Sequence, residues 1–142
     1  MATEPDAIIL AALLDRLGQL VFTPALQIAM PGVDFPASGQ TKPDNYLAAF
    51  FVPNHTLTRT VAQGRQQHRG ILQVSVFWKK GVGHIKPLEA AGKVIDHYPK
   101  DQTFFSEGLK IIIDRKPWLA GPFQDTDRVH VPVSISYHCF AQ

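Results

Sequence analysis

Residues 70–98, GILQVSVFWKKGVGHIKPLEAAGKVIDHY, decide most of the fold that this sequence predicts. From Leu72 to Lys79 apolar side chains mostly alternate with polar ones, which is typical of a β-strand with one buried face. Gly81 and Gly83 then interrupt the strand. The following residues repeat apolar side chains every three or four positions, as an amphipathic helix over 86–98 does. The stretch therefore predicts a strand, a glycine turn and a helix packed as one unit, and nothing in it resembles a reaction centre.

Upstream of this unit, the first twenty residues predict another helix. Thr3 is the expected N-cap, and leucines at three- and four-residue spacings form an apolar stripe. Residues 24–44 contain four prolines, so we expect an irregular connection there, with a short strand at 25–30.

A long antiparallel hairpin is expected in the middle of the chain. Residues 46–52 are apolar on both faces of the predicted strand, which is typical of a strand inside a sheet. Pro53 ends this strand, and the polar residues 54–69 connect it to the strand at 70–79. Residues 46–79 together are therefore predicted to form the hairpin.

Two further strands complete the expected sheet, at 109–114 and 129–140. Pro132 lacks an amide donor, which predicts an edge position or a bulge for the second of them. We find no internal repeat and no low-complexity segment. The sequence therefore predicts one domain over residues 1–142, of the α+β class: a mainly antiparallel sheet of four or five strands with two helices packed on it.

Composition is that of an ordinary globular protein. Hydrophobic residues make up 45% and charged residues 18% of the 142 positions. The single cysteine cannot form a disulfide within the chain, and this low count suits a reducing cytosol. The amino-terminal apolar run lacks the basic start of a secretory signal, and Asp15 and Arg16 interrupt it well short of a membrane span. We expect no membrane contact.

Metal and nucleophile chemistry are not indicated. The six histidines show none of the usual zinc spacings, and one cysteine cannot supply a thiolate cluster. His138 and Cys139 are neighbours in a predicted strand, so their side chains point to opposite faces and cannot act as a base and nucleophile. We therefore expect no metal site.

Cofactor binding and catalysis are not indicated either. Gly81-Val82-Gly83 is too short for a phosphate-binding fingerprint and is better explained as a turn. Trp118, Leu119 and Phe123 favour a covered loop or a subunit contact over an aromatic ligand patch. We expect no cofactor and no enzymatic activity.

Charge is unevenly distributed along the chain. Residues 45–88 contain six basic side chains and no acidic one, whereas residues 1–44 have a net charge of −3 and residues 89–142 of −1. The basic side chains are Arg59, Arg65, Arg69, Lys79, Lys80 and Lys86. Two interpretations remain open: a solvated hairpin that is merely basic, or a surface that faces nucleic acid or an acidic protein. No motif for sequence-specific base reading accompanies the charges.

The order of these segments resembles a known family over most of the chain. The residues that carry the resemblance are Phe35-Pro36, Pro43-Asp44-Asn45-Tyr46-Leu47, Gly70, Gln73-Val74, Lys79-Lys80-Gly81-Val82-Gly83, Ala90-Ala91-Gly92-Lys93-Val94-Ile95, Val131-Pro132-Val133 and Tyr137. This pattern is similar to that of the tail terminator, or tail completion, proteins of long-tailed bacteriophages and prophages.

The resemblance implies a structural protein with no cofactor and no catalysis. Copies would form a ring, commonly a hexamer, that caps the growing tail tube, stops further subunit addition and offers its other face to the head connector or stopper. The protein would belong to the virion tail and would assemble in the cytoplasm of the bacterial host.

Within this family the basic hairpin suggests a site. Our hypothesis is that residues 46–79 contribute to the ring interface or line its lumen, where the arginines would meet acidic neighbours or passing DNA. The candidate residues are Arg59, Arg65, Arg69, Lys79 and Lys80. Two alternatives remain: another neck component, such as a head–tail connector or stopper, or a non-specific nucleic-acid-binding module that uses the basic segment 59–86.

Overall fold

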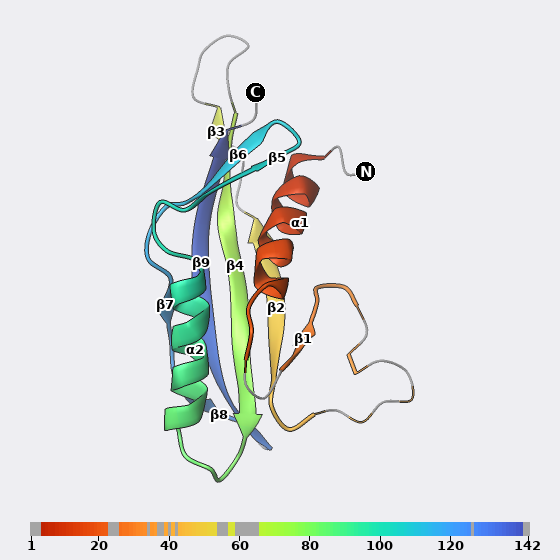
Figure 1. The fold of residues 1–142 in the computed structure, drawn as a ribbon, viewed down its shortest axis with the longest axis vertical. Helices are drawn as coiled ribbons and strands as arrows, with labels where there is room; N and C mark the ends of the chain where they lie inside the picture. Colours follow the sequence, from red (N-terminus) through yellow and green to blue (C-terminus); the bar gives the residue numbers. More distant parts are fainter. Residues whose placement is uncertain are drawn as a thin grey trace.

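The computed structural model of the chain describes residues 4–22, 26–33, 35–36, 39, 41, 43–53, 57–58, 66–125 and 127–140. In these residues two helices lie on the same face of one curled sheet (Figure 1). In chain order the elements are α1 Pro5–Gly18, β1 Gln27–Ala29, β2 Tyr46–Pro53, β3 Leu57–Thr58, β4 Gln66–Lys79, α2 Ile85–His97, β5 Thr103–Ser106, β6 Leu109–Ile113, β7 Trp118–Leu119, β8 Phe123–Gln124 and β9 Arg128–Phe140. The α+β class and both predicted helices are confirmed.

The expected mainly antiparallel sheet of four or five strands is wrong in its number of strands. Within the described ranges the sheet has nine strands, with a central path β1-β2-β4-β9-β6-β5, while β3 pairs with β4 and both β7 and β8 pair with β9. It is mixed, because β1 runs parallel to β2. The missed strands β3, β5, β7 and β8 have two to four residues. So few residues give no readable alternation of apolar and polar side chains.

The predicted hairpin is confirmed. Strands β2 and β4 are antiparallel, from Tyr46 opposite Phe77 to Pro53 opposite Gly70. β4 begins at Gln66, four residues before the predicted start, because its polar first residues pair with the end of β9, where Gln67 lies opposite Phe140.

Pro132 lies inside the sheet, so the prediction of an edge strand is wrong. β9 has β4 on one side and β6, β7 and β8 on the other. The carbonyl oxygen of Pro132 accepts a 3.0 Å hydrogen bond from the amide of Ala120, in the interval between β7 and β8. The amide and carbonyl of one residue in an antiparallel strand point the same way. The missing donor of Pro132 therefore faces this irregular interval and removes no bond to β4.

Helix α1 starts at a side-chain cap. The Glu4 carboxylate accepts a 3.0 Å hydrogen bond from the amide of Ala7, so the N-cap is Glu4, and Thr3, the predicted cap, lies outside the described residues. On its inner side Ile9, Leu13 and Leu17 are fully buried.

The core fills the space between the helices and the inner face of the sheet. It contains Leu72, Val74 and Val76 of β4, with alternate residues of β9 and the inner sides of both helices. The hydroxyl of Tyr98 donates a 2.8 Å hydrogen bond to the carbonyl oxygen of Leu13, which joins the end of α2 to α1. Both helices are thereby fixed on one face, and none is described on the other. No helix among the described residues is long and apolar enough to cross a membrane.

Candidate functional site: the open face of the sheet

The face of β2, β4 and β9 that points away from the helices has no described helix on it, and we call it the open face. It consists of Tyr46, Ala48, Phe50, Val52, Arg69, Ile71, Gln73, Ser75, Phe77, His130, Pro132, Ser134, Ser136 and His138. Paired residues in an antiparallel sheet share a face, so Phe50, Gln73 and Ser134 form one row across three strands.

An aromatic row crosses one end of the open face. The ring centroids of Tyr46 and Phe77 are 4.8 Å apart, and those of Phe77 and His130 are 5.4 Å apart. Phe35 continues the row beyond Tyr46 at 4.9 Å, and Phe123 of β8 continues it beyond His130 at 5.3 Å. These distances are typical of stabilising aromatic pairs. The row therefore holds the segment around Phe35, β2, β4, β9 and β8 in one arrangement.

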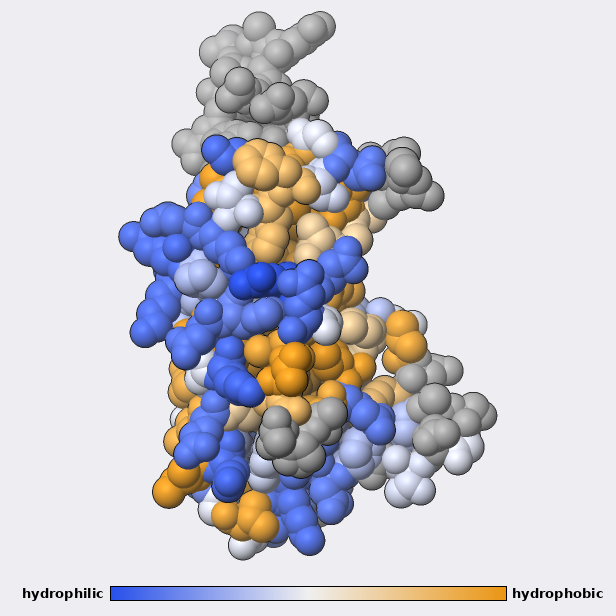
Figure 2. All heavy atoms as spheres, viewed as in Figure 1, coloured by the Kyte–Doolittle hydropathy of each residue, from blue (hydrophilic) through white to orange (hydrophobic). Residues whose placement is uncertain are grey.

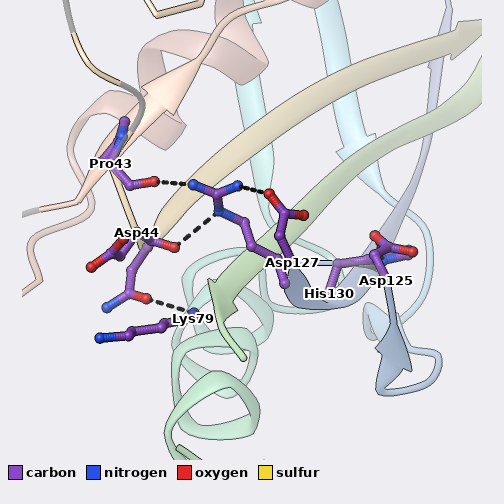
Figure 3. Close-up of polar contacts among 8 residues, drawn as sticks. Pro43, Asp44, Lys79, Asp125, Asp127 and His130 are labelled. Atoms are coloured by element: carbon purple, nitrogen blue, oxygen red, sulfur yellow. Dashed lines mark hydrogen bonds and ion pairs between the residues drawn. The ribbon is translucent and has the colours of Figure 1, made fainter. Parts of the chain in front are cut away.

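Arg128 fixes the chain before β2 against the start of β9 (Figure 3). Its guanidinium donates to the carbonyl oxygens of Pro43 at 2.8 Å and Asp44 at 3.2 Å, and to the carboxylate of Asp127 at 2.7 Å. The guanidinium carbon also lies 5.4 Å from the ring centroid of Tyr46. The side chain is only 12% exposed, so these charge-assisted bonds are well shielded from solvent.

Exposed apolar side chains also lie on β2 and on β7, on either side of the polar Gln73 and Ser134 in the middle of the open face. Phe50 is 48% exposed, Val52 is 53% exposed and Trp118 of β7 is 41% exposed. Ile71 lies opposite Val52 in the register and is half-buried. We call these four residues the apolar patch. The Arg115 guanidinium carbon lies 5.8 Å from the Trp118 ring centroid. Exposed aromatic side chains with arginine are enriched at protein–protein interfaces.

The described basic residues do not form one cluster. Arg69 and Lys79 are exposed on the same face of β4, but ten residues apart, which is about 34 Å along a strand. Lys80 lies in the turn after β4. Arg59 and Arg65, the other two candidates, lie outside the described residues. The site role of all five stays a prediction.

Sequence reasoning found only part of this surface. Trp118 and Phe123 were expected in a covered loop or a subunit contact. Instead of a loop, they lie on two-residue strands, and both side chains are partly exposed. A subunit contact stays a prediction. Phe50 and Val52 were missed, because a strand that is apolar on both faces looked buried on both. The available signal was Gln73 and Ser75 on the partner strand, whose polar side chains share the face with Phe50 and Ala48.

The described residues offer little for chemistry. Among them no group of three or more histidine, cysteine, aspartate or glutamate side chains is arranged to hold a metal ion. Cys139 is fully buried, and burial raises its pKa to about 11, so the thiol is protonated at neutral pH. His138 lies on the opposite face of β9 from Cys139, with its Nδ1 atom 3.6 Å from the Asp114 carboxylate.

A hollow of about 500 Å³ lies beside α2, on the helix side of the molecule. Apolar side chains, including Phe22 and Trp78, line it together with lysines and carboxylates. The Lys93 ammonium group there donates a 2.6 Å hydrogen bond to the carbonyl oxygen of Val21. Because its charges are of both signs, the hollow has no clear preference for the charge of a ligand.

An α+β domain that has no described helix on one sheet face and exposes aromatic side chains there has surface features typical of proteins that act through protein–protein contact. The family model described as phage tail terminator protein matches residues 8–137. The chain belongs to this phage tail terminator family. Membership makes it a structural protein of the phage tail and implies contacts with other phage tail and head proteins; the family is not known to be enzymatic.

Comparison with solved structures supports the fold. One solved chain is 27% identical, superimposes with a TM-score of 0.79, and the match covers 97% of this chain and 96% of that one. No curated protein matches the sequence.

Proposed function

We propose that this protein terminates the phage tail. Copies form a ring on the end of the tail tube, stop further addition of tube subunits, and present the other side of the ring to the head connector or stopper. The observation that carries the proposal is the match of the terminator family over residues 8–137. The exposed apolar patch supports it, because a protein that acts by self-assembly needs such a surface.

The test is electron microscopy of particles made with and without this protein in the phage or prophage that encodes it. Without a terminator, tube growth has no stop, so we expect tails of variable and excessive length that are not joined to heads. Tails of normal length that fail to join heads would instead indicate a connector or stopper. Normal tails joined to heads would contradict both roles.

We also propose that the hairpin of residues 46–79 lies at the ring interface or in its lumen, facing acidic neighbours or passing DNA. Arg69 supports this placement, since it is exposed on the open face. The double variant Arg65→Glu and Arg69→Glu should block tail joining while the monomer stays folded. Lys100→Glu, in an exposed turn, is the matched control and should join tails normally. Normal joining by the double variant would count against this placement.

Assembly in the host cytoplasm and residence in the virion tail follow from the proposed role. A nucleic-acid-binding module is the weaker alternative, because Arg69 and Lys79 lie at opposite ends of β4. Binding of the purified chain to duplex DNA with a steep salt dependence would favour that alternative.

A further inference from the structure

Helix α1 lacks the polar outer side that a surface helix normally has. The eight residues between Asp6 and Asp15 are all apolar, so the middle of the helix is apolar on every side. Its inner side is buried in the core, but Ala7 and Ala11 are exposed. Figure 2, drawn from the helix side, shows apolar side chains reaching this surface beside polar ones. A helix that is apolar all round is normally covered on all sides.

The molecule therefore has two apolar surfaces that nothing described covers, and they lie on opposite sides of the sheet. The outer side of α1 is one, and the apolar patch of the open face is the other. One copy cannot bring them together. A contact between two different surfaces of identical copies is heterologous, and such contacts close into rings when the rotation between copies allows it.

The charges around the two surfaces are opposite. At α1, Glu4, Asp6 and Asp15 outnumber the one cation, Arg16, whose Nε already donates a 3.2 Å hydrogen bond to the His97 carbonyl oxygen. The apolar patch instead has two exposed cations near it, Arg69 on β4 and Arg115 over Trp118, although the Arg115 Nε atom also lies 3.9 Å from the carboxylate of Asp114. Opposite charges at the two surfaces favour their contact and disfavour contact of either surface with itself.

The spacing of the charges also agrees. Arg69 lies four residues along β4 from Gln73, and Trp118 lies two strands across from Gln73, which puts the backbone of Arg69 about 17 Å from that of Trp118, whose ring the Arg115 guanidinium approaches. Glu4 and Asp15 are separated by eleven residues of helix, about 17 Å.

The amino-terminal end of α1 also lies near the level of Arg69. The start of α1 is level with the start of β4, since the Asp6 carboxylate is 3.8 Å from the Nδ1 atom of His68. The end of α1 lies beside the start of β5, because Asp15, Gln102 and Thr103 line one hollow. Glu4 is thus near the level of Arg69.

From these observations we propose that α1 of one copy packs on the apolar patch of the next copy. Glu4 pairs with Arg69 and Asp15 with Arg115 across the contact, while Ala7 and Ala11 leave room for Phe50 and Trp118. The proposal rests on the proposed function, because it supplies the subunit contact of the terminator ring, and its occupant is a second copy of this chain.

Disulfide crosslinking tests the contact directly. The double variant Ala11→Cys and Val52→Cys carries one thiol on each surface, and the native Cys139 is buried and should not react. Oxidation of tails assembled with this variant, and of the concentrated purified protein, should give a ladder of linked copies on a non-reducing gel. Each single variant should stay unlinked, because a heterologous contact does not bring a surface against itself. Linking by a single variant, or no ladder from either sample, would overturn the proposal.

Charge reversal separates this proposal from the proposed function. Arg115→Asp should lower the yield of head-joined tails at least tenfold, and Asp15→Arg in the same chain should restore most of it. Lys100→Asp is the matched control and should have no effect. If the wild-type protein terminates tails but Arg115→Asp does so equally well, the contact is wrong and the function stands. If the wild-type protein does not terminate tails, the function itself is wrong.

Discussion

Gly70 lies so close to Tyr137 that a Cβ atom built on the glycine would stand 2.7 Å from the phenol oxygen. The same Cβ would also lie 2.6 Å from the carbonyl oxygen of Val52, across the β2–β4 pair. Tyr137 is fully buried and stacks on Phe51 with ring centroids 5.8 Å apart. Glycine is therefore required at position 70 because the tyrosine ring and the neighbouring strand occupy the space of a side chain.

Gly70→Ala should lower the free energy of unfolding by about 1–3 kcal/mol, since the added methyl group overpacks the junction of three strands. Urea unfolding followed by circular dichroism measures the change. Gly92→Ala is the control, because a Cβ there meets nothing within 4 Å and the residue lies inside α2. It should raise stability by about 0.8–1.0 kcal/mol. Equal effects of the two substitutions would contradict the predicted crowding at Gly70.

The two fully buried tyrosines should respond differently to loss of the hydroxyl group. Burial raises the pKa of both phenols, but only Tyr98 has a hydrogen-bond acceptor, the Leu13 carbonyl oxygen, among the described residues. Tyr98→Phe should cost about 1 kcal/mol of unfolding free energy. Tyr137→Phe should leave stability unchanged or raise it, because a buried unpaired hydroxyl is removed. The same urea titrations check both values, and the reverse order would contradict the assigned hydrogen bonding.

Arg128→Met should destabilise the fold by about 2 kcal/mol or more, because it removes charge-assisted bonds to Pro43, Asp44 and Asp127 while keeping much of the apolar stem. Arg115→Met is the control. Its side chain is 69% exposed and lies 3.9 Å from the Asp114 carboxylate, so the loss should be under about 0.5 kcal/mol. Thermal unfolding of both variants makes the comparison; a similar loss in both would mean that the Arg128 contacts do not stabilise the fold.

The sequence was sufficient for the parts of the fold that have a long repeat. Two helices and the strand at 70–79 follow from periodicities sustained over eight or more residues, and its partner strand at 46–52 follows from an uninterrupted apolar run. The two-residue strands β7 and β8 do not follow from the sequence. Each is defined only by its pairing with β9, and two residues are too few to show an alternation of apolar and polar side chains. Pro132 was interpreted as a sign of an edge position or a bulge, although its missing donor faces a short break between these two strands.

The candidate site was less accessible from sequence. Alternation predicts that Arg69 and Gln73 share a face, but not that both helices cover the opposite one. The apolar stripe of α1 was readable in the sequence, yet it predicted only one buried side of the helix and no second contact. Which apolar side chains stay uncovered depends on the tertiary packing of α1 and α2, and this packing carries no local sequence signal.

The central claim, that this protein stops tail tube growth, is tested most directly with purified components. Tail tube subunits of the same phage would be allowed to polymerise with increasing amounts of this protein, and tube lengths would be measured by electron microscopy. We predict that mean tube length falls as the protein is added, with a ring of extra density at one end of each tube. Tube lengths that do not change at any ratio, with bare ends, would contradict the claim.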